Sequence, residues 1–302
     1  MIKYSIISSA FNEEENIPVL AEQFRQFNAE HDNQYELIIV DDGSSDSTAE
    51  KAREEESEFI RLAIHKTNLG KTAGIKTGLK YCRGSIIVIY DTDMQYALED
   101  LPRLIKRIET DGFDICTGWK QGHYKKAFVS RVYNSLSRRI FNLPIHDQNG
   151  LKAMKREVLD NIFLRKDWHR YIVSLAVSEG YSVCEEKVEL HERRYGKSKY
   201  GNPFRVFIGI FDMMTVKFIL SFIKKPMLFF GGTGTIFIGL GVITGIIALI
   251  LRFAYDLGFR PLLYLVILFI VSGLILFTMG FLAEILALIF EDLRQSRNKR
   301  ED

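Results

Sequence analysis

The stretch at residues 84–95 has the sequence Gly-Ser-Ile-Ile-Val-Ile-Tyr-Asp-Thr-Asp-Met-Gln. Its apolar part, Ile86 to Tyr90, is short, rich in β-branched residues and preceded by Gly84, which predicts a buried strand. Asp91 and Asp93 follow this strand at once, and burying unpaired carboxylates is costly. Two carboxylates in this position favour a shared divalent cation, because such ions take oxygen ligands and often keep phosphates in their shell. An Asp-capped turn after the strand is the alternative.

The first 120 residues alternate between strand and helix patterns. Asn12 precedes Glu15 at the spacing of a capping box, which predicts one helix start, and Ser47 with Glu50 predicts another. This order predicts an α/β domain with a Rossmann-like, mostly parallel sheet and helices on both faces. Functional residues are then expected at the carboxyl ends of the strands. The strand candidates are Ile6 to Ser8, Leu37 to Val40, Ile60 to Ile64 and Ile86 to Ile89.

Two further segments with polar groups lie near predicted strand ends. Asp41 and Asp42 follow the second strand, and a carboxylate there can accept hydrogen bonds from a ribose hydroxyl or a base N–H. The Gly, Ser and Asp residues at 43–48 are explained by a tight turn into the next helix. Residues 68–71, Asn-Leu-Gly-Lys, suggest a phosphate loop, but His65 stands where a Walker A motif requires glycine. No Gly-x-Gly-x-x-Gly follows the first strand, so a P-loop NTPase and a dinucleotide dehydrogenase are both disfavoured.

Two long apolar runs occupy the C-terminal part of the chain. Leu228 to Leu251 has no charged residue, and Leu262 to Phe290 has only Glu284. Each run is long enough to span a bilayer, and the short link between them predicts a hairpin. Basic residues flank the hairpin on both sides, so the positive-inside rule predicts that its flanks and the N-terminal part face the cytoplasm. These residues are Lys224, Lys225, Arg294, Arg297, Lys299 and Arg300.

Composition agrees with one globular domain of about 200 residues and a membrane appendage. The chain has 302 residues, 47% of them hydrophobic, and a formal net charge of +2. Its basic excess is local, and no nucleic-acid partner is expected. Cys82, Cys116 and Cys184 form no Cys-x-x-Cys pair, which argues against a zinc site or disulfides and fits a reducing compartment. No signal peptide is expected, because Met1 leads directly into a strand.

Several motifs stand in a fixed order along the chain. The first four are Ser8-x-x-Phe11-Asn12-Glu13-Glu14-Glu15-Asn16-Ile17, Val40-Asp41-Asp42-Gly43-Ser44-x-Asp46-x-Thr48, Asn68-x-Gly70-Lys71 and Asp91-x-Asp93-x-Gln95. In this order and spacing they resemble the family 2 glycosyltransferases. Two later motifs narrow the resemblance to the polyprenyl-phosphate glycosyltransferases, which include dolichyl-phosphate mannose and glucose synthases and bacterial undecaprenyl-phosphate sugar transferases. They are Asp147-Gln148-Asn149-Gly150-Leu151-Lys152 and Glu192-Arg193-Arg194-Tyr195-Gly196-Lys197-Ser198-Lys199-Tyr200.

The resemblance implies a GT-A fold and a role for each matching residue. Residues implied to bind the nucleoside end of a UDP- or GDP-linked sugar are Asn12, Glu13 and Asp42, with Asp41 and Lys71 nearby in the same substrate-binding site. Residues implied to hold Mg²⁺ or Mn²⁺ at the donor diphosphate are Asp91, Asp93 and Gln95. Residues implied to bind the lipid phosphate are Arg131, Arg193, Ser198 and Lys199. Direct catalytic roles are implied for Asp93, Asp147 and Arg193. The chain departs from the family pattern at Tyr96, where His or Asp is usual, and at Leu151 and Lys152, where Phe and Arg are usual.

The chemistry of the reaction agrees with these residue types. Departure of a diphosphate builds negative charge, which a divalent ion stabilises. An acceptor phosphate is ionised near neutral pH, so it needs positioning by Arg and Lys more than a general base. A solvated basic loop is the alternative for residues 192–200, although a place just before a membrane-proximal segment favours an anionic-lipid role.

The predicted protein is an inverting, metal-dependent transferase that moves one sugar from a nucleotide donor to polyprenyl phosphate. The alternatives are a family 2 transferase acting on another lipid or on a growing polysaccharide, and a non-catalytic membrane scaffold of the same fold. A homo-oligomer is compatible with each of these functions. Residues 203–225 are apolar with interspersed charges, which suits interfacial helices better than a third span. The predicted parts are a cytoplasmic catalytic domain at 1–202, interfacial amphipathic helices at 203–227, a transmembrane hairpin at 228–290 and a basic cytoplasmic tail at 291–302.

Overall fold

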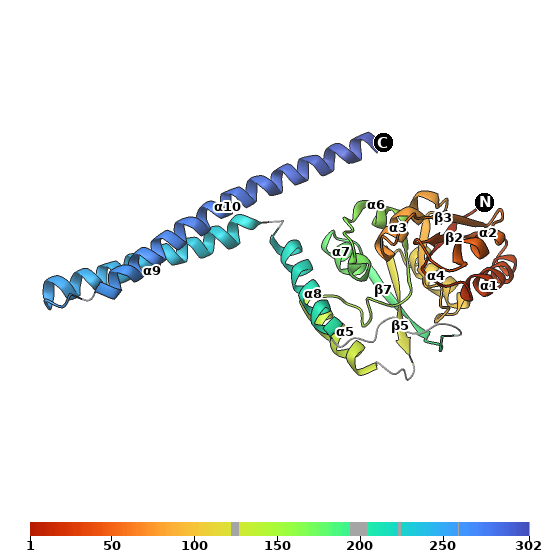
Figure 1. The fold of residues 1–302 in the computed structure, drawn as a ribbon, viewed down its shortest axis with the longest axis horizontal. Coiled ribbons are helices and arrows are strands. Elements are labelled where there is room, and N and C mark those ends of the chain that lie inside the picture. Colours follow the sequence, from red (N-terminus) through yellow and green to blue (C-terminus); the bar gives the residue numbers. More distant parts are fainter. Residues whose placement is uncertain (122–126, 194–203, 223–224, 259, 302) are drawn as a thin grey trace. The chain divides into compact units, whose positions relative to one another are not determined.

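A computed structural model describes residues 1–121, 127–193, 204–222, 225–258 and 260–301 of the chain (Figure 1). The chain forms two compact units, Met1–Met213 and Met214–Asp302. All described strands belong to the first unit, and the second unit contains two long helices. Helix α8 (Phe204–Phe222) begins in the first unit and ends in the second.

Strands and helices alternate through most of the first unit, as the sequence pattern predicts. The strands are β1 (Tyr4–Ala10), β2 (Tyr35–Asp41), β3 (Ile60–Ile64), β4 (Ile86–Tyr90), β5 (Ile115–Gln121), β6 (Lys152–Lys155) and β7 (Val183–Glu189). The helices are α1 (Asn16–Glu30), α2 (Thr48–Glu54), α3 (Lys71–Tyr81), α4 (Leu101–Glu109), α5 (Ala127–Phe141), α6 (Arg156–Asn161) and α7 (Ile172–Ser178). Short 3₁₀ turns lie at Leu98–Asp100 and Trp168–Tyr171.

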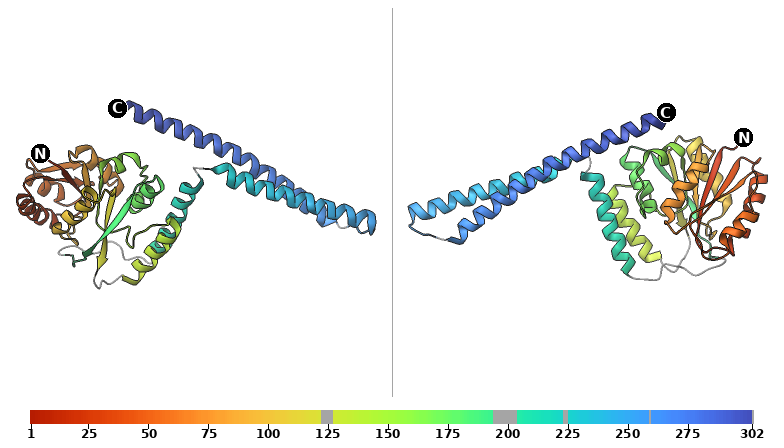
Figure 2. Two further views of the ribbon diagram at one scale, coloured as in Figure 1. Left: turned by 180° about the vertical axis from the view of Figure 1, so that it is seen from behind. Right: turned by 45° about the horizontal axis from the view of Figure 1, so that its top comes forward.

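The strands form one seven-stranded sheet in the order β3-β2-β1-β4-β6-β5-β7. Strand β6 runs antiparallel to β4 and β5, and every other neighbouring pair is parallel. The four predicted strands correspond to β1, β2, β3 and β4, which confirms the mostly parallel α/β sheet. Figure 2 shows helices on both sides of this sheet. Because β1, β2 and β4 are parallel, the loops after them share one edge of the sheet.

Apolar side chains fill both faces of the central strands. Ile6 of β1 belongs to a core cluster with Leu20 of α1 and Leu104 of α4. The next residue, Ile7, points to the opposite face, where it lies against Gly78 of α3. Strand β1 is therefore packed on both sides, which holds the polar loop at its carboxyl end in a defined position.

The first helix starts later than its capping pattern predicts. Helix α1 begins at Asn16, with Glu15 at the N-cap position and no side-chain cap. Asn12 adopts a left-handed φ of 53°, and its Oδ1 accepts a hydrogen bond from the Ser45 N–H at 2.9 Å. The predicted cap at Asn12 is therefore wrong, because its side chain is used by a loop from another strand. Ser47 does occupy the N-cap position of α2, but its side chain makes no capping hydrogen bond.

The second unit contains α9 (Pro226–Ala254) and α10 (Arg260–Glu301). Two stretches of these helices, Pro226–Ala254 and Arg260–Ile289, are long and apolar enough to cross a membrane, with mean hydropathies of 2.5 and 2.7. They coincide with the two predicted spans to within a few residues.

Glycines allow the two long helices to pack closely in antiparallel order. A methyl group added at Gly234 would lie 2.6 Å from the Gly273 carbonyl oxygen, and one at Gly273 would lie 2.8 Å from the Gly234 carbonyl oxygen. Small residues at such contacts are typical of membrane helix pairs. The Glu284 carboxylate of α10 accepts a hydrogen bond from the Met227 N–H at 3.1 Å. The one charge in the second apolar run therefore caps the start of α9, where a negative group is favourable.

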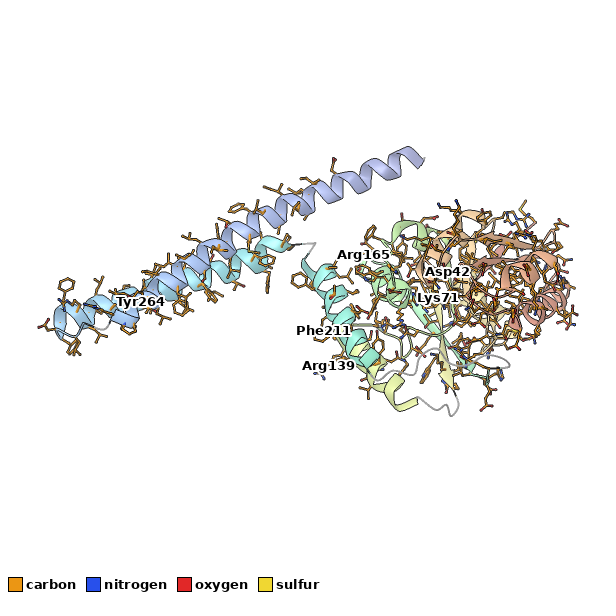
Figure 3. All side chains as sticks on the ribbon, in the orientation of Figure 1. Asp42, Lys71, Arg139, Arg165, Phe211 and Tyr264 are labelled. Carbon is orange, nitrogen blue, oxygen red and sulfur yellow. The ribbon has the colours of Figure 1, made fainter. Side chains whose placement is uncertain are left out.

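The described residues of the segment predicted to form interfacial helices, 203–227, include helix α8 and the first two residues of α9. The Gly209 carbonyl of α8 accepts a hydrogen bond from the Tyr171 hydroxyl at 3.2 Å, and that hydroxyl accepts one from Tyr133 at 3.0 Å. Phe211, on the same helix, is 67% exposed (Figure 3). The beginning of α8 is therefore attached to the first unit, while its place in a membrane interface stays a prediction.

Candidate active site

Hydrogen bonds join the loops that follow β1 and β2. The Asn12 N–H donates to Ser44 Oγ at 2.9 Å, and Asn12 Oδ1 accepts from the Ser45 N–H. The Glu13 N–H donates to Thr48 Oγ1 at 2.8 Å. These bonds bring the first two segments predicted to bind the donor together at one edge of the sheet.

Asp42 organises the loop that leads into α3. Its Oδ1 accepts hydrogen bonds from the Leu69 N–H at 2.9 Å and from His65 Nδ1 at 2.7 Å, and its Oδ2 accepts one from the Gly70 N–H at 2.8 Å. Asp42 is 3% exposed, so these donors compensate a buried charge. A carboxylate has about four acceptor positions, which leaves about one for a ligand. The predicted contact of Asp42 with a nucleoside stays a prediction.

Asp41 is also engaged by the protein. Its carboxylate accepts hydrogen bonds from the Ser44 hydroxyl and, at 3.4 Å, from the Ser44 N–H. Gly43, which lies between Asp41 and Ser44 in the sequence, has a φ of 71°, and a side chain there would overlap the backbone of Thr67. A glycine is therefore required at this turn, and Asp41 shapes the turn from inside.

Lys71 and Asp91 form an ion pair at the same edge of the sheet. Lys71 is the first residue of α3, and its ammonium donates a hydrogen bond to the carboxylate of Asp91, which follows β4. Figure 3 marks Asp42 and Lys71 in the first unit. A helix start and an ammonium group both favour negative charge, so this position suits a phosphate group.

Asp93 meets a segment that lies about a hundred residues further along the chain. Arg193 Nη2 lies 2.8 Å from Asp93 Oδ2, and Arg193 Nε donates to Gln95 Oε1 at 3.4 Å. The Gln95 side-chain amide donates to the His191 carbonyl oxygen at 3.3 Å. Burial raises the pKa of Asp93, and the negative charge of Asp91 raises it further, while Arg193 opposes both. The structure thus brings the predicted metal motif and the predicted lipid-phosphate segment into contact.

The residues at this edge fit a divalent cation. Asp91 and Asp93 lie close enough for one charge to raise the pKa of the other carboxyl group, and a cation between them would relieve that repulsion. Together with Gln95 they offer only oxygen ligands, which Mg²⁺ and Mn²⁺ prefer. Within the part of the chain that the structure describes, no three His, Cys, Asp or Glu side chains form a closed metal cage. Two carboxylates are nevertheless sufficient for Mg²⁺ when substrate phosphates complete its shell.

Lys152 supplies a buried cation beside these groups. It is 6% exposed, and its ammonium donates to the Gly150 carbonyl oxygen at 2.9 Å. Burial lowers the pKa of Lys152 to about 8, and repulsion from Lys71 adds to this, while Asp147 and Asp91 act in the opposite direction. A buried ammonium group with so few partners favours an anionic ligand.

Asp147 lies close enough to Lys152 for its negative charge to raise the pKa of that lysine. Its Oδ1 accepts a hydrogen bond from the Asn149 N–H at 2.8 Å, and its Oδ2 lies 3.4 Å from Lys120 Nζ. Asp147 is 3% exposed. Its carboxylate therefore holds a turn and a second lysine, and its predicted part in catalysis stays a prediction.

His169 is a site residue that the sequence analysis did not single out. The His169 N–H donates to Thr72 Oγ1 at 3.2 Å, and His169 Nδ1 lies 3.2 Å from the same oxygen. Burial lowers the pKa of His169 to about 3, and the charges of Lys71 and Arg170 lower it further, so the ring is neutral. No local pattern around residue 169 indicates this role, because its partner lies 97 residues away in the sequence.

Three of the residues predicted to bind the lipid phosphate have no described side chain, so their contacts are not assigned. Ser198 and Lys199 lie outside the residues that the structure describes, and so does the side chain of Arg131, although Arg131 is part of α5. Of the four, Arg193 alone has a described side chain.

The sequence analysis also missed His65 as a site residue. Its place just after β3 is a signal of the kind that identified Asp91.

Residues 5–171, more than half of the chain, match the model of a protein family described as Glycosyl transferase family 2. The chain therefore belongs to this glycosyltransferase family. It is 30% identical to a dodecaprenyl-phosphate galacturonate synthase from Rhizobium johnstonii, over 95% of this chain and 88% of that protein. It is 28% identical to an undecaprenyl-phosphate 4-deoxy-4-formamido-L-arabinose transferase from Pseudomonas fluorescens, over 96% of this chain and 86% of that protein. The predicted resemblance to polyprenyl-phosphate sugar transferases is confirmed.

Solved structures share the fold of the first unit. Glucosyl-3-phosphoglycerate synthase from Mycobacterium tuberculosis, in complex with Mn²⁺, UDP-glucose and phosphoglyceric acid, matches with a TM-score of 0.55 and 19% identity. The match covers 71% of this chain and 80% of that one. The same enzyme with Mg²⁺ and UDP matches with a TM-score of 0.54 and 19% identity. These matches confirm the GT-A fold class, and the metal and nucleotide belong to the mycobacterial structures.

Proposed function

We propose that this protein transfers a single sugar from a nucleotide-sugar donor to polyprenyl phosphate at the cytoplasmic face of a membrane. The donor is linked to UDP or GDP, and the reaction inverts the configuration of the anomeric carbon. The two relatives described above, which act on dodecaprenyl and undecaprenyl phosphate according to their names, support this acceptor class.

The contact between Asp93 and Arg193 carries the proposal. Asp93 belongs to the motif assigned to the donor diphosphate, and Arg193 belongs to the segment assigned to the acceptor phosphate. Their 2.8 Å contact supports a single site in which both phosphate groups meet. A non-catalytic scaffold would have no need for this pair, so the intact network disfavours that alternative.

The proposed reaction needs no general base. An oxygen of the acceptor phosphate forms the new bond to the anomeric carbon as the bond from that carbon to the diphosphate oxygen breaks, and the nucleoside diphosphate leaves. The acceptor phosphate is already ionised near neutral pH, because its second pKa is about 6. Arg193 orients it and offsets part of its charge, and its planar guanidinium suits bidentate contact with phosphate.

Two lysine side chains receive the negative charge of the leaving diphosphate. Lys71 at the start of α3 and the buried Lys152 face the negative charge that develops there. Mg²⁺ or Mn²⁺ held by Asp91, Asp93 and Gln95 would stabilise that charge when bound. Asp147 keeps Lys120 in place beside Lys152, which is a positioning role.

The membrane part of the proposal follows from charge and hydropathy. Helices α9 and α10 form a hairpin at 228–290 that spans the bilayer, with the catalytic domain at 1–202 and the basic tail at 291–302 both in the cytoplasm. Helix α8, within 203–227, lies in the interface near the lipid headgroups. This arrangement gives a site in the first unit access to a lipid phosphate without extracting the lipid chain. Self-association of the protein is compatible with it.

A panel of acceptors tests the acceptor class. The full-length protein in detergent is incubated with UDP- and GDP-linked sugars, Mg²⁺ and one of undecaprenyl phosphate, diacylglycerol or a short oligosaccharide. We expect sugar incorporation with undecaprenyl phosphate and none with the other two. Transfer to diacylglycerol or to the oligosaccharide, with undecaprenyl phosphate inert, would instead support one of the other family 2 activities.

A further inference from the structure

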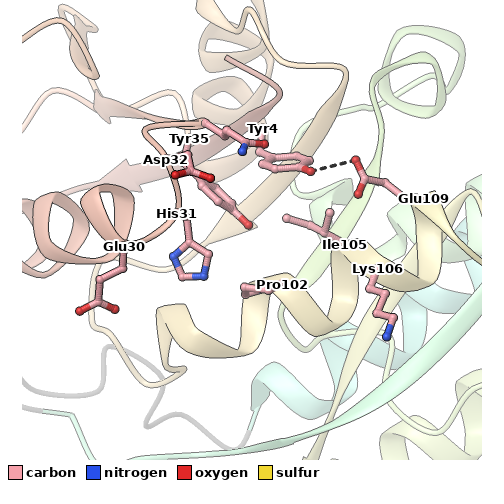
Figure 4. A pocket seen from close by; sticks show the side chains of 10 residues that line it. Tyr4, Glu30, His31, Asp32, Tyr35, Pro102, Ile105, Lys106 and Glu109 are labelled. Carbon is pink, nitrogen blue, oxygen red and sulfur yellow. Dashed lines mark hydrogen bonds between the residues drawn. The ribbon is translucent and has the colours of Figure 1, made fainter. Parts of the chain in front are cut away.

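A pocket lies at the edge of the sheet opposite the candidate active site. It has a volume of about 300 Å³ and is formed by the turn after α1, the starts of β1 and β2, and α4 (Figure 4). Strands β1 and β2 are seven residues long, so their amino ends lie about 20 Å from the loops that form the candidate active site. The pocket is therefore separate from the proposed transfer reaction.

The hydroxyl of Tyr35 is the first sign that this pocket takes a ligand. Tyr35 is 3% exposed, and its hydroxyl makes no hydrogen bond with any residue that the structure describes. Figure 4 shows it directed into the space between His31, Pro102 and Ile105. The hydroxyl borders the pocket and is not one of the fully buried polar atoms that lack a partner, so a group inside the pocket can reach it. A polar group of a ligand would supply the hydrogen bond that the protein does not provide.

Aromatic rings form the wall around that hydroxyl. The ring centroids of Tyr4 and Tyr35 are 4.7 Å apart, and those of His31 and Tyr35 are 5.7 Å apart. The His31 Nδ1–H donates to the Phe27 carbonyl oxygen at 2.7 Å, which holds its ring in place. Ring faces carry partial negative charge, so a group of aromatic rings attracts a cation.

Charged groups on the pocket favour the same kind of ligand. Its lining includes the carboxylates of Glu30, Asp32 and Glu109 and one ammonium, that of Lys106. Glu109 accepts a hydrogen bond from the Tyr4 hydroxyl at 2.9 Å and forms no ion pair with any described residue. Burial, together with this hydrogen bond, raises the pKa of Tyr4 to about 12, so its phenol stays neutral. An anion would be repelled here, and a quaternary ammonium would leave the Tyr35 hydroxyl without a partner.

We propose that this pocket binds the primary ammonium group of an aliphatic amine. The ammonium donates hydrogen bonds to the Glu109 carboxylate and to the Tyr35 hydroxyl oxygen, while its methylene chain lies against the rings of Tyr4 and His31. A free diamine and a lysine side chain of another protein both offer this chemistry. The pocket is thus a binding site for a small organic cation, remote from the sugar-transfer chemistry.

Calorimetric titration of the full-length protein in detergent with cadaverine tests this site. We expect saturable binding of one cadaverine per chain and no binding of pentanoate, an anion with the same number of carbons. Tyr35→Phe keeps the ring and removes only the hydroxyl, so it should weaken binding about tenfold without lowering stability. Glu109→Gln should weaken binding at least as much. Glu54→Gln, which removes an exposed carboxylate at the end of α2, should leave binding unchanged.

A second titrant distinguishes the two sources of the amine. Nα-acetyl-lysine amide that binds more tightly than cadaverine would identify a lysine side chain as the natural ligand, and the reverse order would identify a free diamine. Non-saturable binding would overturn the proposal. So would equal affinity of the wild type and Tyr35→Phe, or equal weakening by Glu109→Gln and Glu54→Gln, because general surface charge would then explain the result.

Discussion

Replacing Lys152 with methionine removes a cation from the interior of the candidate active site. Lys152 is 6% exposed, and burial is the main reason why its pKa falls from 10.5 to about 8. That fall corresponds to about 3 kcal/mol of unfavourable free energy for the charged form at neutral pH. The methionine side chain has a similar length and carries no charge. We therefore expect Lys152→Met to be more stable than the wild type at pH 7, by at most about 3 kcal/mol.

The pH dependence of this gain follows from the direction of the pKa change. The folded protein releases the Lys152 proton at lower pH than the unfolded chain does, so the unfolded state binds more protons between about pH 8 and 10.5. Wild-type stability rises with pH in that window, and the unfavourable contribution is fully present below about pH 8. The difference in Tm between Lys152→Met and the wild type should therefore be largest at pH 7 and vanish towards pH 10.5.

Thermal melting of the detergent-solubilised proteins between pH 7 and 10.5 measures this difference. Lys80→Met is the matched control, because Lys80 is exposed near the end of α3. Its melting temperature should differ from that of the wild type by the same amount at every pH. A constant difference for Lys152→Met as well, or a lower Tm at pH 7, would refute the idea that burial of the Lys152 ammonium group destabilises the folded protein.

Three further predictions concern the transfer reaction and the membrane. Asp93→Ala should abolish sugar transfer with the fold retained by circular dichroism, and wild-type activity should vanish in excess chelator and return with Mg²⁺ or Mn²⁺. Arg193→Ala should lower lipid-dependent turnover by about ten- to a hundredfold with little change in nucleotide-sugar binding, and Arg193→Lys should restore only part of it. An equal loss of donor binding would contradict that role. Reporters fused at Met1 and after Asp302 should both indicate a cytoplasmic location, and an external signal at either end would contradict the two-span topology.

Most of the sheet could be predicted because its central strands are buried on both faces. Such strands are short apolar runs bounded by polar loops, and the runs in β1, β2, β3 and β4 have this form. Strand β6 and the antiparallel part of the sheet were not predicted. Lys152–Lys155 is only four residues long, and a lysine stands at each end, so no apolar pattern marks it.

The candidate site could be predicted where its functional residues directly follow a strand in the sequence. Asp91 and Asp93 were found in this way, and the structure brings both to the same edge as Asn12 and Asp42. What could not be predicted is which atoms are already used within the protein. Three of the roughly four acceptor positions of the Asp42 carboxylate are occupied by donors up to 28 residues away, and His169 contacts Thr72 across 97 residues. Such pairings depend on how the loops fold back on the sheet, which residue patterns do not encode locally.

The mass of the lipid product tests sugar transfer to polyprenyl phosphate most directly. Purified full-length protein is incubated with undecaprenyl phosphate, Mg²⁺ and a panel of nucleotide sugars, and the extracted lipid is analysed by mass spectrometry. We predict a product heavier than undecaprenyl phosphate by one sugar residue, with release of the nucleoside diphosphate and no product from Asp93→Ala. A product that retains the sugar phosphate, or that carries a chain of several sugars, would contradict this account.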